Sequence, residues 1–462
     1  MKDPYLLTAT ELAAAYRARS LSPVEAVQSC LARIKALDGH LQAFIELHET
    51  EALLAAQAAH KALRAGCDLG PLHGVPVGLK DLVAVQGKIW TAGSKIHLHR
   101  RAPYTATLAQ KLMAAGAISL GKLHSVEFAF GAWGTNHHLG TPKNPWKPQG
   151  HYTPGGSSSG SGVAVAARML PLAVGTDTGG SVRIPAAFNG ITGLKVSYGR
   201  ISTQGVEMLS PSLDTPGPMA RSVEDAMLMY LAMRGPDPQD PATLGLPADD
   251  PAVSLHLGVR DLRLGRIDLG DCGCAVEADM VAAYEDALLS FARLGAKIIT
   301  VKLPQTLAEL AGLSQILAGE AYGAHGDLAE DPDSPMGPAT RARILSGRIS
   351  VKEYLQLVWR RQELTEAYLA AIEPVEALIL PTTPHPAIPL ADVDESGGPS
   401  ILTRPINLFG GCALALPSGM SGDGLPLSIQ ICGRAYAEAL VLRIGQAFQR
   451  ATTWHELIPP EL

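Results

Sequence analysis

The 462-residue sequence predicts an α/β protein with a largely buried, mixed β-sheet that is covered by helices on both faces. Three observations lead to this expectation. Short apolar runs bounded by turn residues alternate with helix-length segments along the whole chain. Apolar residues make up 47% of the composition and charged residues only 18%, so the chain can bury a large core. Its many glycines and prolines are spread out, which indicates ordered loops and not a low-complexity linker.

Composition also excludes several classes of function. The formal net charge is −6 and no basic block occurs, which argues against direct contact with nucleic acid. No apolar run reaches the roughly 20 residues that a membrane-spanning helix needs. The N-terminus lacks the apolar segment of a signal peptide, so we expect a cytoplasmic protein. The cysteines are scattered apart from Cys272 and Cys274, and this pair has no second pair, so we expect free, buried thiols and no zinc site.

The beginning of the chain is expected to be a helical cover. Thr8 with Glu11, and Ser22 with Glu25, match the capping box that opens a helix. The alanine-rich segment 51–65 predicts a third helix. We assign these helices to packing and not to chemistry.

The first candidate functional residue follows a buried strand. Residues 72–79 form an apolar run with turn residues at its start, and the run ends in Lys80 and Asp81. A solvated strand end is one interpretation of this charged pair. The other is a buried, functional lysine. Such a lysine would be unusual, because lysine is almost never fully buried without a partner.

The remaining pattern alternates between the two types of element. We expect helices at 107–113, from about 223, at 280–294, over most of 309–373 and at 437–451, and strands at 117–121, 191–196, 297–301, 377–380 and 425–432.

Two glycine- and serine-rich loops lie in the segment 155–183 and suggest close approach of the backbone to a substrate. Residues 156–160 match the pattern G-x-S-x-G. No strand precedes this pattern, as the nucleophile elbow of α/β-hydrolases requires. No lysine follows the glycines, which argues against a phosphate-binding loop.

A serine without an evident histidine and aspartate needs another base to activate it. Burial lowers the pKa of a lysine toward the neutral state, so Lys80 can be that base. The second loop, residues 178–181, presents successive N–H groups with little side-chain obstruction, and such a nest can hold an oxyanion. Residue chemistry alone therefore favours a serine hydrolase.

Histidines and tryptophans in the loops carry less information. His97 with His99, and His137 with His138, lack partners at metal-ligand spacing, so we expect no metal and no cofactor. Tryptophans in the neighbouring loops could line a pocket or cover the core.

These residues together resemble the amidase signature family. The matching segments are Gly74 to Asp81, Gly155 to Ser158, Gly175 to Arg183, Gly193 to Lys195, Asp214 to Ser222, Pro381 to Pro384 and Gly424 to Pro426. The resemblance implies a triad in which Ser181 is the acyl-enzyme nucleophile and Lys80 the general base. Ser157, after an expected cis bond to Gly156, would bridge them. The two serines are 24 residues apart, the same interval as in the family.

The resemblance also implies three groups of further site residues. Backbone N–H groups of Thr178, Gly179, Gly180 and Ser181 would form the oxyanion hole. Ala129 and Phe130 would lie on the substrate side. Ser158, Asp177 and Arg183 would support the loops by hydrogen bonds.

The resemblance covers nearly the whole chain and implies one domain, 1–462. Within it we expect a helical cover at 1–70, the signature core at 71–235, a variable, mostly helical substrate-side region at 240–370 and a return to the sheet at 371–462.

The implied activity is hydrolysis of a carboxamide C–N bond to a carboxylate plus ammonia or an amine. Two alternatives stay open within the family: the glutamine-hydrolysing subunit of an aminoacyl-tRNA amidotransferase, and a hydrolase of carbamate (urethane) or urea-type substrates. A non-catalytic binding protein on the same fold is disfavoured by the intact Lys80, Ser157 and Ser181. We expect a small-molecule amide substrate and no contact with nucleic acid or membrane. A homodimer is an open alternative, since dimers are common.

Overall fold

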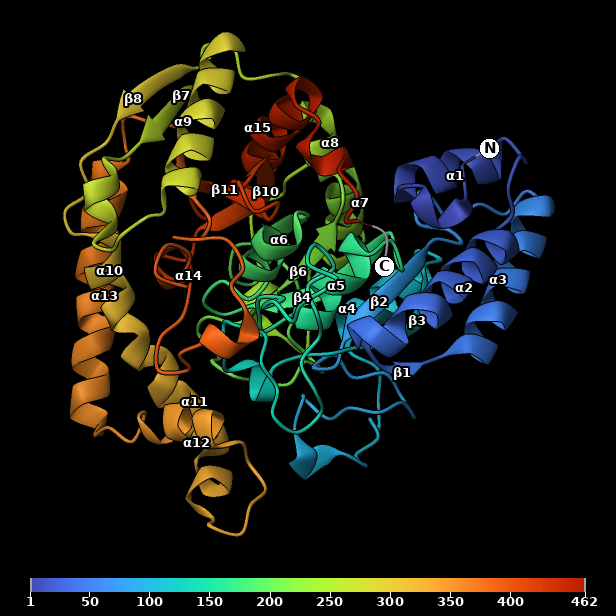
Figure 1. Cartoon of the computed structure of the whole chain (residues 1–462), viewed down its shortest axis with the longest axis horizontal. Helices are drawn as coiled ribbons and strands as arrows, with labels where there is room; N and C mark the ends of the chain where they lie inside the picture. Colours follow the sequence, from blue (N-terminus) through green and yellow to red (C-terminus); the bar gives the residue numbers. More distant parts are fainter. Residues whose placement is uncertain (1, 461–462) are drawn as a thin grey trace.

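Eleven strands form one mixed sheet at the centre of the molecule (Figure 1). The computed structural model describes residues 2–460. The strands are β1 (Phe44–Leu47), β2 (Pro76–Lys80), β3 (Ile118–Leu123), β4 (Leu172–Asp177), β5 (Thr192–Lys195), β6 (Thr215–Ala220), β7 (Arg263–Arg266), β8 (Lys297–Thr300), β9 (Ala377–Pro381), β10 (Cys412–Met420) and β11 (Pro426–Gly433). Their order is β1-β3-β2-β4-β6-β5-β10-β11-β9-β7-β8.

The direction of the strands makes the sheet mixed. Parallel ladders join β2 to β3 and β4, and β7 to β8 and β9. The remaining neighbours run antiparallel. The predicted α/β class with a mixed central sheet is confirmed.

Fifteen α-helices are found in the described part of the chain. They are α1 (Ala9–Arg17), α2 (Pro23–Leu41), α3 (Glu49–Arg64), α4 (Thr107–Ala114), α5 (Ser159–Ala166), α6 (Arg183–Asn189), α7 (Val223–Met233), α8 (Pro251–Ser254), α9 (Ala278–Arg293), α10 (Leu307–Ala311), α11 (Gln315–Glu330), α12 (Pro338–Leu345), α13 (Val351–Ala371), α14 (Arg404–Leu408) and α15 (Glu438–Ala451). Both predicted capping boxes, at Thr8 and Ser22, are present.

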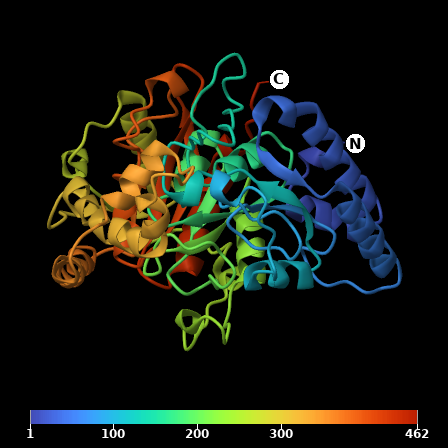
Figure 2. The same cartoon turned by 90° about the horizontal axis from the view of Figure 1, so that it is seen from below.

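Helices bury both faces of the sheet. In β4, Leu172 and Val174 belong to a core shared with α7 and α15, whereas Ala173 between them packs in a core shared with α2 and α5. This alternation is what a strand covered on both sides requires. In both views α2 and α3 lie at one end of the molecule and α13 at the other (Figures 1 and 2).

Several elements were not predicted from the sequence. These include β1, β6, β7, β10, α6, α8 and α14. The strand β6 reads Thr-Pro-Gly-Pro-Met-Ala, and proline is rare in central strands because it cannot donate to a ladder. The β5–β6 ladder contains only the pairs Thr192–Ala220 and Gly193–Met219, so both prolines lie beyond it.

The described chain contains neither a membrane-spanning helix nor a disulfide. Within residues 2–460, no helix combines the length and the apolar character needed to cross a bilayer. All six cysteines are free thiols, as predicted, but the expected burial is wrong for Cys67, which is exposed, and for Cys274, which is partly exposed.

Candidate active site

Lys80 ends β2 beneath the neighbouring loops, and its side chain is fully buried. The strand end is therefore not solvated. Its Nζ donates hydrogen bonds to Ser157 Oγ at 2.7 Å and to Thr176 Oγ1 at 2.8 Å. Burial lowers the pKa of Lys80 to about 7, although the nearby carboxylates of Asp177 and Asp214 oppose this shift. A substantial fraction of this amine is therefore neutral, and able to accept a proton, near pH 7.

Ser157 lies in the loop before α5 and is also fully buried. The peptide bond between Gly156 and Ser157 is cis, as the family resemblance implied. The Gly156 N–H donates to the Ala132 carbonyl at 2.7 Å, and the Ser157 carbonyl accepts from Val126 N–H at 3.1 Å. These bonds hold the Ser157 hydroxyl against the lysine and away from solvent.

Ser181 lies between β4 and α6 and is 8% exposed. Its carbonyl accepts a hydrogen bond from Ser158 N–H at 3.3 Å, which ties the two serine loops together. Among residues 2–460, no hydrogen bond joins the hydroxyls of Ser157 and Ser181. The Lys80–Ser157 half of the predicted relay is thus hydrogen-bonded, whereas the Ser157–Ser181 half is not.

The loop that precedes Ser181 leaves several backbone donors unused. The Gly180 N–H donates to Asp177 Oδ1 at 2.8 Å, so this one of the four predicted oxyanion donors is already engaged. Within the described chain, the N–H groups of Thr178, Gly179 and Ser181 make no hydrogen bond. Gly180 has φ of +130°, and a Cβ there would lie 2.2 Å from the Thr403 hydroxyl oxygen, so the loop requires glycine.

A buried ion pair between Asp177 and Arg183 stabilises this loop. Arg183 Nε and one of its terminal nitrogens donate to the two oxygens of Asp177 at 3.0 and 3.1 Å, and both side chains are fully buried. The guanidinium also donates to Gln430 at 2.9 Å and to Asn407 at 2.6 Å. Burial raises the pKa of Asp177, but Arg183 outweighs this effect and the pKa falls to about 2.

Ser158 connects the first loop to the sheet. Its hydroxyl donates to the Thr176 carbonyl at 3.2 Å and accepts from the Thr176 N–H at the same distance. Ser158 and the Asp177–Arg183 pair therefore contact the two loops that the family resemblance expects them to support.

Two polar residues of the site had no role assigned from the sequence. Thr176 is the second partner of Lys80, and Asp214 accepts from the Thr178 hydroxyl at 2.5 Å and from Leu209 N–H at 2.8 Å. Burial raises the pKa of Asp214 to about 6, against the effect of its hydrogen bonds. The signal available was the segment beginning at Asp214, which matched the family pattern without a function.

A cavity of about 400 Å³ opens in front of Ser181. Its wall includes Ala129 and Phe130, the two residues that the family resemblance assigns to the substrate side. The other lining residues are Gly131, Ala132, Thr178, Gly179, Ser181, Ile184, Leu209, Ser314, Gln315, Leu317, Ala318, Arg343, Ser346, Ser396, Gly397, Gly398, Ser400, Ile401 and Arg404. Several of them come from α11, α12 and α14, which lie far from the serine loops in the sequence.

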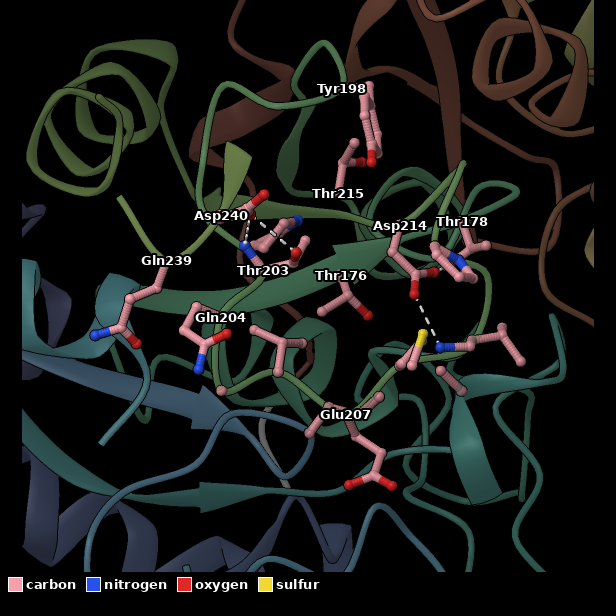
Figure 3. Close-up of a pocket in the computed structure, with 18 of the residues that line it drawn as sticks. Thr176, Thr178, Tyr198, Thr203, Gln204, Glu207, Asp214, Thr215, Gln239 and Asp240 are labelled. Atoms are coloured by element: carbon pink, nitrogen blue, oxygen red, sulfur yellow. Dashed lines mark hydrogen bonds between the residues drawn. The ribbon is translucent and has the colours of Figure 1, made fainter. Parts of the chain in front are cut away.

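A second cavity, of about 350 Å³, lies behind the same loop. It shares Ala129, Thr178 and Leu209 with the first cavity. Figure 3 shows Asp214 and Thr178 side by side in it, and Asp240 away from them.

The loop tryptophans belong to the core. Trp133 and Trp146 pack with Phe188, and Trp133 stacks on His385 at 5.5 Å between ring centroids. In the described chain, no group of three or more His, Cys, Asp or Glu side chains is arranged to hold a metal ion.

Comparison with known proteins places this geometry in a family. A family model described as Amidase matches residues 25–442. The A-subunit of glutamyl-tRNA(Gln) amidotransferase from Geobacter metallireducens is 36% identical over 480 residues, which cover 97% of this chain and 98% of the relative. The peptide amidase of Stenotrophomonas maltophilia has a similar structure, with a TM-score of 0.86, 30% identity and 96% of both chains covered.

A further similar structure is described as a vestigial protein complex that reveals the evolutionary origins of an s-triazine catabolic enzyme. Its TM-score is 0.89 at 32% identity, with 96% of this chain and 98% of that chain covered. Family match and structural similarity both extend over nearly the whole chain. This chain belongs to the amidase signature family and is an enzyme of the amidase type, which hydrolyses carbon–nitrogen bonds.

Proposed function

We propose that this protein is a serine amidohydrolase that cleaves a linear carboxamide through an acyl-enzyme on Ser181. The observation that carries the proposal is the buried 2.7 Å hydrogen bond from Lys80 to Ser157, combined with a lysine pKa of about 7. A lysine with this pKa is matched to general-base work at neutral pH.

The first step forms the acyl-enzyme. Ser181 loses its proton to Ser157 as Ser157 passes its own proton to neutral Lys80, and the Ser181 oxygen attacks the carbonyl carbon. This step requires the Ser181 side chain to turn toward Ser157 when substrate binds. The free N–H groups of Thr178, Gly179 and Ser181 are the donors for the resulting oxyanion.

The second step releases products. The C–N bond breaks as the relay returns a proton to the leaving nitrogen, so ammonia or an amine departs. Water then attacks the acyl-enzyme, giving up its proton through the same relay, and the carboxylate is released. The Asp177–Arg183 pair and Ser158 act in this proposal as loop supports and not as reacting groups.

One alternative has a specific observation in its favour. The Geobacter metallireducens relative bears the name of one component of a glutamyl-tRNA(Gln) amidotransferase. A glutamine-hydrolysing subunit would use one substrate and depend on protein partners. A free-standing amidase would hydrolyse its substrate alone. Carbamates and urea-type compounds carry the same scissile bond to nitrogen and extend the proposed range of substrates.

The test uses the purified chain without added protein. We expect hydrolysis of at least one class among short aliphatic amides, aryl amides, carbamates and glutamine, and complete loss of it in Ser181→Ala. Ser290→Ala on α9, far from the serine loops, is the matched control and should retain activity. A fluorophosphonate probe should label wild type and not Ser181→Ala. Undiminished turnover by purified Ser181→Ala would refute the nucleophile, and activity that appears only with a second chain would favour the amidotransferase alternative.

A further inference from the structure

Arg404 stands in the cavity in front of Ser181 without an acidic partner. It is the first residue of α14, and its side chain runs along the proposed oxyanion loop. A Cβ placed on Gly179 would lie 3.6 Å from both Cγ and Nε of Arg404. One terminal nitrogen donates to Ser400 Oγ at 2.6 Å. Within residues 2–460 no carboxylate is paired with this guanidinium.

The other arginine of the cavity already has a carboxylate partner. Arg343, on α12, forms an ion pair with Glu395 and donates to the carbonyls of Phe130 and Glu395, both at 2.7 Å. Among the described residues that line this cavity, Arg404 is therefore the arginine that has no carboxylate partner.

The cavity has no internal counterion for Arg404. Among the described residues that line it, none is an aspartate or a glutamate. Burial, and then the positive charge of Arg343, lower the pKa of Arg404. Keeping a partly buried guanidinium charged without a counterion costs free energy, and a bound anion would offset that cost.

From this geometry we propose that Arg404 selects amides that carry a carboxylate close to the scissile carbonyl. The inference rests on the proposed amide hydrolysis at Ser181. A guanidinium offers two parallel N–H groups to a carboxylate, which fixes position as well as charge. Because Arg404 lies against Gly179, beside the free N–H groups, the carboxylate and the reacting carbonyl sit a few bonds apart. Short dicarboxylic monoamides, such as succinamate and glutaramate, meet this requirement.

Glutamine meets it only in part. Glutamine and glutaramate share the same chain length, amide and carboxylate, but glutamine adds an α-ammonium group. That ammonium finds no carboxylate among the described residues of the cavity wall. Desolvating an unpaired ammonium is unfavourable, so glutaramate should be the better ligand.

The binding test uses Ser181→Ala protein, which cannot form the acyl-enzyme. Calorimetry compares glutaramate, its neutral counterpart pentanamide, and glutamine. We expect glutaramate to bind about 10- to 100-fold more tightly than pentanamide, the range expected for a charge-assisted hydrogen bond. Adding Arg404→Gln should remove this difference and leave the affinity for pentanamide unchanged. Arg404→Lys keeps the charge and should retain part of the preference.

Controls separate this inference from a folding defect and from the proposed function. Arg360→Gln, on the exposed face of α13, removes a surface arginine paired with Glu363 and should change no affinity. Equal thermal midpoints for the Arg404 variants would show an intact fold. Equal binding of glutaramate and pentanamide, or an equal loss of both in Arg404→Gln, would overturn the selection of anions.

Turnover by the wild-type chain distinguishes failure of the anion-selection inference from failure of the proposed amide hydrolysis. If an anionic amide binds through Arg404 but is never hydrolysed, the amidohydrolase proposal fails and the binding inference stands. If neutral and anionic amides are hydrolysed with equal kcat/KM in wild type and in Arg404→Gln, the enzyme stands and the inference is wrong.

Discussion

Replacing Lys80 by methionine tests the depressed pKa on which the proposed mechanism depends. The folded pKa is about 7 against an ordinary value of 10.5, so unfolding takes up a proton between these values. The unfolded state binds more protons, and the stability of wild type must rise with pH across this window. Methionine has no such dependence.

The size of the effect follows from the two pKa values. The penalty for the buried lysine is about 4 kcal/mol at pH 7 and about 2 kcal/mol at pH 9, by linkage with 1.36 kcal/mol per pKa unit. The free energy of unfolding of wild type should therefore increase by about 2 kcal/mol from pH 7 to pH 9, relative to that of Lys80→Met over the same range. The variant also leaves the hydroxyls of Ser157 and Thr176 without their donor, but this loss does not depend on pH in this range.

The assay is urea unfolding of both proteins at pH 7, 8 and 9, with the slope of free energy against urea compared at each pH. Lys35→Met, on the exposed side of α2, controls for the loss of a surface lysine. A difference between wild type and Lys80→Met that stays constant from pH 7 to pH 9 would refute the reasoning, because the lysine would then be charged throughout. The same pKa should appear in wild type as a fall of kcat/KM below about pH 7, tenfold per pH unit.

Three further substitutions test the site. Asp214→Asn removes a negative charge that favours protonated Lys80, so the acidic limb of the kcat/KM profile should move to lower pH; a shift to higher pH would contradict this. Gly180→Ala places a Cβ against the Thr403 hydroxyl at an unfavourable φ and should displace the neighbouring N–H groups of Gly179 and Ser181. A displaced oxyanion donor should lower kcat/KM by about 100-fold, and unchanged kinetics would argue against the role of this loop. Asp177→Asn leaves Arg183 buried without its counterion and should cost about 3–5 kcal/mol in urea unfolding.

The part of the site that the sequence could predict is the part whose signal is local. Lys80 was recognisable because a lysine follows an apolar strand. The glycine–serine loops were recognisable because close backbone approach restricts residue type. Local sequence patterns likewise predicted the capping box at Thr8 and the alternation of helices and strands.

The part that could not be predicted depends on contacts between distant segments. Thr176 and Asp214 are ordinary polar residues until folding places one against Lys80 and the other against Thr178. No local signal in the sequence marks Arg404, because its lack of an acidic partner is a property of the assembled cavity. Local propensity also misleads for β6, whose two prolines pair with residues of β4 and lie beyond its short ladder with β5.

The parallel pairing of β2 and β4 has a consequence for how such enzymes diversify. Lys80 terminates β2, and Asp177 terminates β4 four residues before Ser181. The interstrand spacing, about 4.8 Å in any sheet, therefore sets the separation of the proposed base from the loop that carries the proposed nucleophile. Arg343 and Arg404 lie on α12 and α14, which are outside this pair of strands. Under the proposed function, exchange of these peripheral side chains would change substrate preference without moving the proposed proton relay.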